Sequence, residues 1–245
     1  MSKRNIKLVV EYDGADFSGW QSQPGARTVQ DVIRDAIEAV TGERVKLTGA
    51  GRTDAGVSAK AQVANFLTSS RLPVAKLRDA LNANLPCDVA IREAEEVAAD
   101  FHACYCARWK TYRYTIHNSP VRSPLRRRFA HWLRFPLDVG RMAEAAEVLV
   151  GKHDFRSFQT GPARRSSVRT VKRIAVWRED ELVHVEIEAS GFLYNMARAM
   201  AGALVRVGLG KLSPAGLRAM LEASDRRRGP TNLPPNGLCL MEVKY

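Results

Sequence analysis

The order of strand-like and helix-like segments is the feature that most constrains the fold of this 245-residue chain. Apolar residues alternate with polar ones over residues 6–12, which predicts a strand. Thr28 then precedes an apolar stripe at helical spacing, and Gly42 follows its end, as expected for a capped amphipathic helix. The rest of the first half predicts, in order, a strand at 44–49, a strand at 62–67, a helix at 73–85 and a strand at 89–91.

The second half shows the same order, with one further helix. Its pattern predicts a strand at 112–116, a helix at 142–149, a hairpin at 174–189, helices at 194–207 and 214–221, and a strand at 238–243. The order β-α-β-β-α-β is that of a ferredoxin-like unit. We therefore expect an α+β fold of two ferredoxin-like halves, residues 1–100 and 101–245, with antiparallel sheets abutted around a central cleft.

A glycine-rich turn joins the second and third predicted strands of the first half. The stretch Gly49-Ala50-Gly51-Arg52-Thr53-Asp54-Ala55-Gly56 contains an arginine and a carboxylate two residues apart. In an extended segment these two side chains point to the same face, so the guanidinium of Arg52 would keep Asp54 ionised and oriented as a nucleophile. The same residues also fit a simple hairpin turn, because aspartate and glycine are favoured there. The turn by itself leaves both interpretations open.

The charge balance favours a polyanionic partner. The chain carries 38 Lys and Arg against 26 Asp and Glu, a net charge of +12, and such an excess attracts nucleic acids. Arginine clusters occur at 126–128, 164–165 and 226–228. No stretch has the length of apolar residues that a membrane span or a secretory leader needs, so we expect a cytoplasmic protein with no membrane partner.

The inventory of reactive residues excludes several classes of enzyme. Cys87, Cys104, Cys106 and Cys239 form no C-x-x-C pair, so we expect reduced thiols, mostly packed inside, with Cys104 and Cys106 on one face of a strand, and no metal site. Phosphate-binding loops, dinucleotide-binding loops and serine nucleophile elbows are absent from the sequence. One carboxylate, many arginines and scattered aromatic residues remain, which fits a nucleic-acid enzyme that uses no cofactor.

Several ordered motifs resemble those of the tRNA pseudouridine synthase A family. They span nearly the whole chain and are Tyr12-Asp13-Gly14, Gly19-Trp20-Gln21, Arg27-Thr28-Val29-Gln30, Gly51-Arg52-Thr53-Asp54-Ala55-Gly56-Val57, Phe101-His102-Ala103, Lys110-Thr111-Tyr112-Arg113-Tyr114, Asp154-Phe155 with Ser157-Phe158, Gly191-Phe192-Leu193-Tyr194 with Met196 and Arg198, and Gly237-Leu238. Motifs of this length in this order are not expected by chance.

The resemblance implies isomerisation of uridine to pseudouridine at positions 38, 39 and 40 of the tRNA anticodon stem-loop, by a homodimer without cofactor or metal. Asp54 would be the catalytic nucleophile, and attack on the base, attack on the sugar and removal of a sugar proton all remain open to it. Among the substrate-binding residues, Tyr112 would stack on the flipped uracil, Arg198 would pair with the aspartate, and Arg52 would help to hold the displaced nucleotide.

Three positions depart from the family pattern: Ser58 replaces a usual histidine, Ala61 a glycine and Cys104 a common arginine. Peripheral RNA contacts are the features that these changes put in doubt. From the residues alone, Tyr112 fits sheet packing, Arg198 a solvent-exposed helix position, and Trp20 either a packing anchor or a base-stacking platform. Two alternative functions also stay open: an RNA-binding module without catalysis, and a pseudouridine synthase that acts on another RNA.

Overall fold

The computed structural model describes residues 3–161 and 166–245, so the arginine cluster at 164–165 lies outside the described residues. The chain divides into two compact units. Unit 1 comprises Met1–Arg108 together with Leu240–Tyr245, and unit 2 comprises Trp109–Cys239. A division at residue 100 differs from these bounds mainly because the chain returns to unit 1 at Leu240.

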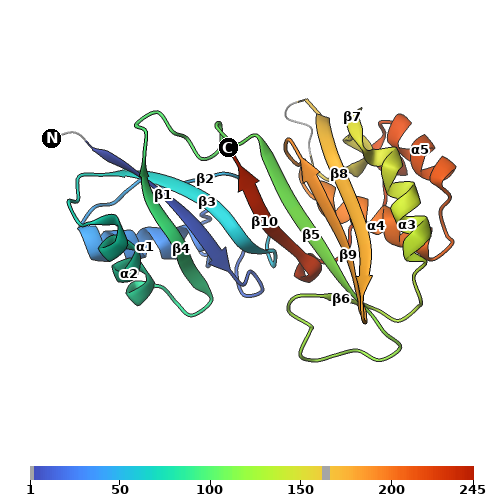
Figure 1. Ribbon diagram of the computed structural model, residues 1–245, viewed down its shortest axis with the longest axis horizontal. Helices are drawn as coiled ribbons and strands as arrows, with labels where there is room; N and C mark the ends of the chain where they lie inside the picture. Colours follow the sequence, from blue (N-terminus) through green and yellow to red (C-terminus); the bar gives the residue numbers. More distant parts are fainter. Residues whose placement is uncertain (1–2, 162–165) are drawn as a thin grey trace. The chain divides into compact units, whose positions relative to one another are not determined.

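Unit 1 contains the predicted β-α-β-β-α-β order. Its elements are β1 (Arg4–Tyr12), α1 (Val29–Thr41), β2 (Thr48–Gly49), β3 (Ser58–Thr68), α2 (Val74–Asn84), β4 (Val89–Val97) and the larger part of β10 (Leu238–Lys244). Strand β1 pairs antiparallel with both β3 and β4, and β10 follows β3 in the sheet. Helices α1 and α2 lie on one face of this sheet (Figure 1).

The ends of α1 confirm the predicted caps. The side-chain oxygen of Thr28 accepts a hydrogen bond from the backbone N–H of Asp31, and Gly42 ends the helix with a φ of 71°. The predicted strand at 44–49 is wrong for most of its length, because only Thr48–Gly49 pairs with β3. The Leu47 carbonyl instead accepts a hydrogen bond from the Gln30 side chain of α1, at 2.8 Å.

Unit 2 contains the predicted elements and two additional short strands. Its elements are β5 (Trp109–Asn118), β6 (His131–Leu133), α3 (Val139–Ala146), β7 (Gly151–Asp154), β8 (Val168–Glu179), β9 (Leu182–Ala189), α4 (Met196–Gly208), α5 (Pro214–Glu222) and the start of β10. The sheet order is β5-β9-β8-β7, all antiparallel, and β6 runs parallel beside β5. The α+β prediction is therefore confirmed, and β6 and β7 are the strands that the sequence pattern missed.

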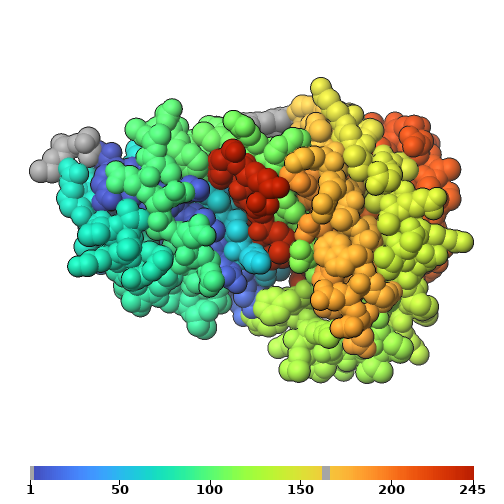
Figure 2. Space-filling view, viewed as in Figure 1, coloured from blue at the N-terminus to red at the C-terminus, as the bar shows by residue number. Residues whose placement is uncertain are grey.

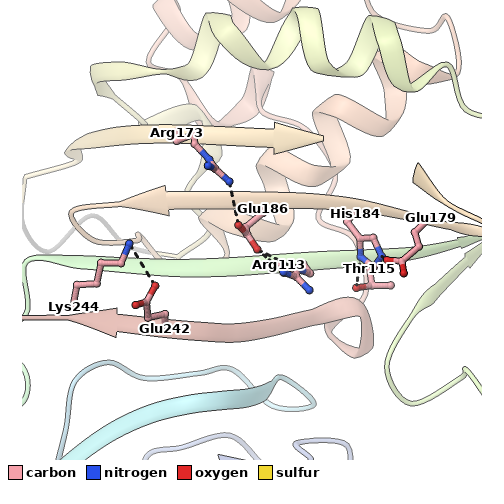
Figure 3. Close-up of polar contacts among 8 residues, drawn as sticks. All are labelled: Arg113, Thr115, Arg173, Glu179, His184, Glu186, Glu242 and Lys244. Carbon is pink, nitrogen blue, oxygen red and sulfur yellow. Dashed lines mark hydrogen bonds and ion pairs between the residues drawn. The ribbon is translucent and has the colours of Figure 1, made fainter. Parts of the chain in front are cut away.

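One face of the unit 2 sheet carries charged and polar side chains, as Figure 3 shows for strands β5, β8 and β9. Glu186 on β9 pairs with Arg113 on β5 at 2.8 Å and with Arg173 on β8 at 3.5 Å. His184, also on β9, contacts the Thr115 hydroxyl at 3.1 Å and packs on the Trp177 ring. Burial, followed by the nearby Arg113 charge, lowers the pKa of His184, so its neutral form is favoured on this face.

Candidate active site

Residues 50–57, here called the Asp54 loop, connect β2 to β3 in unit 1. Backbone and side-chain hydrogen bonds fix the start of this loop: the Ala50 N–H donates to the Val63 carbonyl at 2.7 Å, and the Gln62 side chain donates to the Gly51 carbonyl at 2.9 Å. The Val57 N–H donates to the carbonyl of Asp54 at 3.1 Å and closes a turn after it. The predicted position of Asp54 in the connection between two strands is therefore confirmed.

A second loop, residues 13–20, lies against the Asp54 loop, and we call it the anchor loop. Its Trp20 N–H donates to the Thr53 carbonyl at 3.1 Å, and its Phe17 carbonyl accepts from the Gly56 N–H at 3.2 Å. These bonds engage the residue before Asp54 and the second residue after it. The backbone of the anchor loop thus determines where the Asp54 backbone lies.

Two glycines make this contact sterically possible. A Cβ at Gly14 would lie 2.0 Å from the Val57 carbonyl oxygen, and a Cβ at Gly19 would lie 2.7 Å from the Thr53 carbonyl oxygen. Gly19 also has a φ of +95°, in the region that side-chain-bearing residues avoid. Glycine at 14 and 19 is therefore required for the two loops to touch.

Aromatic side chains hold the two loops from inside unit 1. The hydroxyl of Tyr12, at the end of β1, shares a buried 2.7 Å hydrogen bond with the Thr53 hydroxyl. Trp20 is fully buried, and a Cβ at Gly49 would lie 2.5 Å from its Nε1. Of the two interpretations of Trp20, the structure supports the packing anchor, because a buried indole offers no free face to a base.

An ion pair secures the anchor loop to the rest of unit 1. The Arg27 guanidinium makes two hydrogen bonds to the Asp88 carboxylate, at 2.8 and 3.0 Å, and lies over the Phe17 ring at 3.9 Å. The hydrogen bond from Arg27 to Asp88 raises the pKa of the arginine. Because the Phe17 carbonyl binds Gly56, this ion pair positions the Asp54 loop through one intermediate residue.

The predicted pairing of Arg52 with Asp54 is wrong. Asp54 is half-buried, whereas the Arg52 side chain is exposed and makes no hydrogen bond or ion pair with any residue that the structure describes. The prediction assumed extended backbone through residue 54, but the chain turns immediately after it. Arg52 is therefore oriented toward solvent, where an RNA phosphate could reach it.

Arg198 occupies the first turn of α4 in unit 2 and is half-buried rather than exposed. Its Nε donates to the Leu233 carbonyl at 2.6 Å, and its Nη1 donates to the Asn195 side chain at 2.8 Å. Asn195 precedes the helix with a φ of 62°. The contact with Leu233 depends on Gly202, where a Cβ would lie 2.3 Å from the Thr231 carbonyl oxygen.

Tyr112 lies on β5, buried to 7% exposure, with its ring edge-to-face against Phe192 at 4.8 Å. This contact supports the packing interpretation and also fixes the orientation of the ring. Tyr114, two residues along the same strand, donates its hydroxyl to the Pro234 carbonyl at 2.7 Å. Burial raises the pKa of Tyr114, and the Arg198 charge opposes that shift, so Arg198 lies close to β5.

The cysteine predictions are wrong in two respects. Cys87, Cys104 and Cys106 are exposed and Cys239 is half-buried, so they are not mainly packing residues. Cys104 and Cys106 lie in a turn before β5 rather than on a strand. Within the described residues, no three His, Cys, Asp or Glu side chains are grouped as a metal site would require. Nor is any described helix long and apolar enough to cross a membrane.

Comparison with known proteins identifies the family. The sequence model of the family described as "tRNA pseudouridine synthase" matches residues 8–106 and 145–245. The chain belongs to the tRNA pseudouridine synthase family. Among curated relatives, "tRNA pseudouridine synthase A" of Acetivibrio thermocellus is 46% identical over 99% of this chain and 100% of that protein. "tRNA pseudouridine synthase A 2" of Clostridium perfringens is 44% identical over the same shares of the two chains.

Solved structures show only weak likeness. The chain of "Structure of H/ACA RNP bound to a substrate RNA containing 2'-deoxyuridine" aligns with a TM-score of 0.39 at 13% identity. The alignment covers 82% of this chain and 44% of that chain, so this chain spans less than half of that chain's length. Likeness at this level does not bear on function.

The family motifs map onto the anchoring contacts, several of which the sequence interpretation missed. Ser58, which departs from the family pattern and is the first residue of β3, accepts a hydrogen bond from the Gly14 N–H at 3.0 Å and thus joins the start of β3 to the anchor loop. Tyr12, Thr53 and Gln62 also hold the loop without having been selected. The sequence feature that could have pointed to these residues is the pair of glycines at 14 and 19, because glycine permits a close approach of two backbones.

Proposed function

We propose that this chain isomerises uridine to pseudouridine at positions 38, 39 and 40 of the tRNA anticodon stem-loop, with Asp54 as the catalytic nucleophile. The observation that supports the assignment of Asp54 is the set of hydrogen bonds from the anchor loop to Thr53 and Gly56, on either side of it. A nucleophile must be held in a defined geometry before the substrate arrives. The anchor loop supplies that rigidity.

The reaction needs no redox partner. The bond between N1 of uracil and C1′ of ribose breaks, the base rotates, a bond forms between C5 and C1′, and a proton leaves C5 while N1 gains one. Atoms and electrons are conserved, so an ionised carboxylate and a site that holds the freed base suffice. A half-buried Asp54 carboxylate can act in this role if a cation favours its charged form.

The other proposed residues supply the remaining requirements. The target base must leave the helical stack, and the Tyr112 ring would replace the lost stacking. Arg198, whose Nε and Nη1 are oriented by Leu233 and Asn195, would pair with the aspartate. Arg52, exposed and without a described partner, would hold the displaced nucleotide with its planar guanidinium.

We further propose that the chain acts as a homodimer on tRNA in the cytosol. The net charge of +12 supports an RNA substrate, because neutralising phosphates is the main source of affinity for nucleic acids. Of the rival functions, a binding module would not explain a fixed, half-buried carboxylate. A synthase for another RNA would share the same chemistry and differ in substrate.

The decisive experiment compares Asp54→Asn with Asp100→Asn, a change of an exposed carboxylate in the same unit. We expect Asp54→Asn to keep tRNA affinity within several-fold and to abolish pseudouridine formation, while Asp100→Asn retains both. Mass-spectrometric mapping of tRNA and of ribosomal RNA from cells lacking the protein, and from cells with it restored, identifies the modified positions. Substantial turnover by Asp54→Asn would remove Asp54 from the chemistry, and pseudouridine in ribosomal RNA alone would favour the other synthase.

A further inference from the structure

Arg169, the second residue of β8, carries a guanidinium whose hydrogen-bonding capacity is only partly used. Its Nη1 donates to the Ser166 carbonyl at 2.8 Å and to the Val168 carbonyl at 2.7 Å. These two bonds engage both N–H groups of Nη1. Among the residues that the structure describes, Nε and Nη2 have no partner.

No carboxylate of the described residues neutralises the charge of this arginine. The Arg169 side chain is nevertheless half-buried, and burial is the cause that lowers its pKa. Removing a cation from water without pairing it with an anion costs free energy, and such groups are concentrated at functional sites. An anionic ligand at Arg169 would offset that cost.

The unused donors lie together on one edge of the Arg169 guanidinium. The Nε–H and one Nη2–H point in parallel from this edge, at the spacing that binds two oxygens of one phosphate. The bonds of Nη1 to the two carbonyls hold the plane of the group in place. A ligand would therefore meet a preformed pair of donors, and little side-chain entropy would be lost on binding.

Gly191 keeps this edge of Arg169 accessible. A Cβ at Gly191 would lie 3.6 Å from the Nε of Arg169, so a larger side chain there would cover the donors. The ends of β8 and β9 are joined beside it, because the Ser190 N–H donates to the Thr170 carbonyl at 2.9 Å and the Thr170 N–H donates to the Ser190 hydroxyl at 3.2 Å. Figure 1 shows the start of β8 beside β7, and in Figure 2 the yellow-orange atoms of β8 reach the surface of unit 2.

The position of Gly191 links Arg169 to Tyr112. Gly191 directly precedes Phe192, whose ring packs edge-to-face against Tyr112 at 4.8 Å. The Arg169 guanidinium and the Tyr112 ring thus contact consecutive residues of one segment. In the proposed function the target base stacks on Tyr112, and a nucleotide turned out of its helix carries a phosphate on each side of its sugar.

We propose that Arg169 binds a phosphate beside the target uridine through its Nε and Nη2. The inference rests on the proposed function and adds to it a residue that fixes the backbone of the flipped nucleotide, while Tyr112 holds the base. The competing explanation is a structural role, in which Arg169 serves only to close the turn at residues 166–169 through Nη1.

The first test compares Arg169→Gln with Arg173→Gln. Arg173 is on the same strand, is 65% exposed and pairs with Glu186, so the control removes the same charge from β8. We expect Arg169→Gln to bind a synthetic anticodon stem-loop about tenfold more weakly. The slope of log K against log salt concentration should fall by about 0.7–0.9, the loss of one phosphate contact. The control should keep the affinity and the slope of the wild type.

A second variant and a second RNA make the test independent of how well Arg169→Gln folds. Arg169→Lys keeps the charge but loses the paired donors, so it should retain the salt slope and bind several-fold more weakly. In the RNA, a neutral methylphosphonate replaces each linkage beside the target uridine in turn, with 2′-O-methyl ribose before the linkage in modified and unmodified RNA alike. One of the two neutral linkages should cost the wild type about tenfold in affinity and should cost Arg169→Gln almost nothing.

Two results would overturn the inference. One is an Arg169→Gln protein that matches the control in affinity and salt slope and differs only in thermal stability, which would assign Arg169 to the turn alone. The other is a neutral linkage effect of equal size in the wild type and in Arg169→Gln at both positions. Pseudouridine formation on unmodified tRNA is measured separately: if the wild type forms none, the proposed function fails, whereas the phosphate contact is still judged by binding.

Discussion

The Asp54 loop in unit 1 and the first turn of α4 in unit 2 are both held by other segments of their own unit, but through different kinds of contact. The Asp54 loop receives backbone hydrogen bonds from the anchor loop, and glycines allow the two backbones to touch. Arg198 is instead held through its side chain, because its guanidinium donates hydrogen bonds to the Leu233 carbonyl and to the Asn195 side chain. The proposed nucleophile is thus positioned through its main chain, and its proposed cationic partner through its side chain.

The difference suggests how each residue would tolerate change. A main chain held on both sides of Asp54 fixes its Cα and leaves the carboxylate only the two torsions of its own side chain. A long side chain anchored at its guanidinium can be released by moving the carbonyl that it binds. The predictions below separate these two modes of support.

The largest effect is expected for Gly19→Ala, compared with Gly25→Ala. Both glycines have positive φ, +95° and +73°, so the backbone strain is similar. A Cβ at Gly25 meets nothing within 4 Å, whereas one at Gly19 lies 2.7 Å from the Thr53 carbonyl oxygen. Displacement of the Asp54 loop by about 1 Å should lower single-turnover rates by about 100-fold in Gly19→Ala.

In the control, Gly25→Ala, the rate should stay within a few-fold of the wild type. Measurement of both rates, with thermal unfolding as a check on folding, tests the role of the anchor loop. If the two variants lost the same amount of activity, strain alone would explain the effect, and the backbone contact would not position Asp54.

A smaller effect is expected for Gly202→Ala, which acts on unit 2. The new Cβ would lie 2.3 Å from the Thr231 carbonyl oxygen and would displace the segment whose Leu233 carbonyl holds Arg198. We expect a loss of about 1–3 kcal/mol in the free energy of unfolding and a turnover reduced about tenfold. Urea denaturation and steady-state kinetics measure the two quantities.

Gly140→Ala provides the control for this helix substitution. Its Cβ would meet only the Asp138 side chain, at 3.4 Å, so it should leave turnover unchanged and stabilise by up to about 1 kcal/mol through helix propensity. Full activity in Gly202→Ala would show that Arg198 does not depend on the Leu233 carbonyl.

The smallest effect concerns pH and again separates the units. Because the pKa of His184 is lowered in the fold, the unfolded chain binds more protons as pH falls through about 6.5, the usual histidine value. Stability therefore rises with pH in this window and is lost below it. Hydrogen exchange at pH 5.5 relative to pH 7.5 should show a greater loss of protection in β9 than in β3, because His102 is the only histidine of unit 1.

The variant His184→Gln should reduce this difference. His131, whose pKa burial also lowers, would account for what remains. An equal loss of protection in both units would exclude His184 as the source of the pH dependence.

The parts of the fold that followed from the sequence are those with a long local pattern. Strand β1, the β8–β9 hairpin and the capped helix α1 each repeat their period over enough residues to be recognised. Strands β6 and β7 have three and four residues, which is too short for a period to show. The predicted strand at 44–49 does not form over most of its length. The Leu47 carbonyl accepts a hydrogen bond from the Gln30 side chain of α1 rather than from a neighbouring strand.

In the candidate site, too, the features that a local pattern indicates were predicted, and those that depend on distant residues were not. The position of Asp54 between two strands followed from the glycine-rich turn, but its predicted pairing with Arg52 required knowledge of the turn after Asp54. The partner of Arg198 lies 35 residues away in the chain, at Leu233. No local pattern reports a contact over that separation, so the half-buried state of Arg198 could not be read from the sequence.

Strand β10 has a consequence for the order in which the units can form during synthesis. Its residues from Leu240 belong to unit 1, where the Tyr245 hydroxyl donates to the Ala103 carbonyl at 2.8 Å and its ring packs on Phe101. On the ribosome, this strand emerges only after all of unit 2 has been translated. The unit that begins first is therefore completed second, and until then the part of the β3 edge that β10 covers lacks that strand partner.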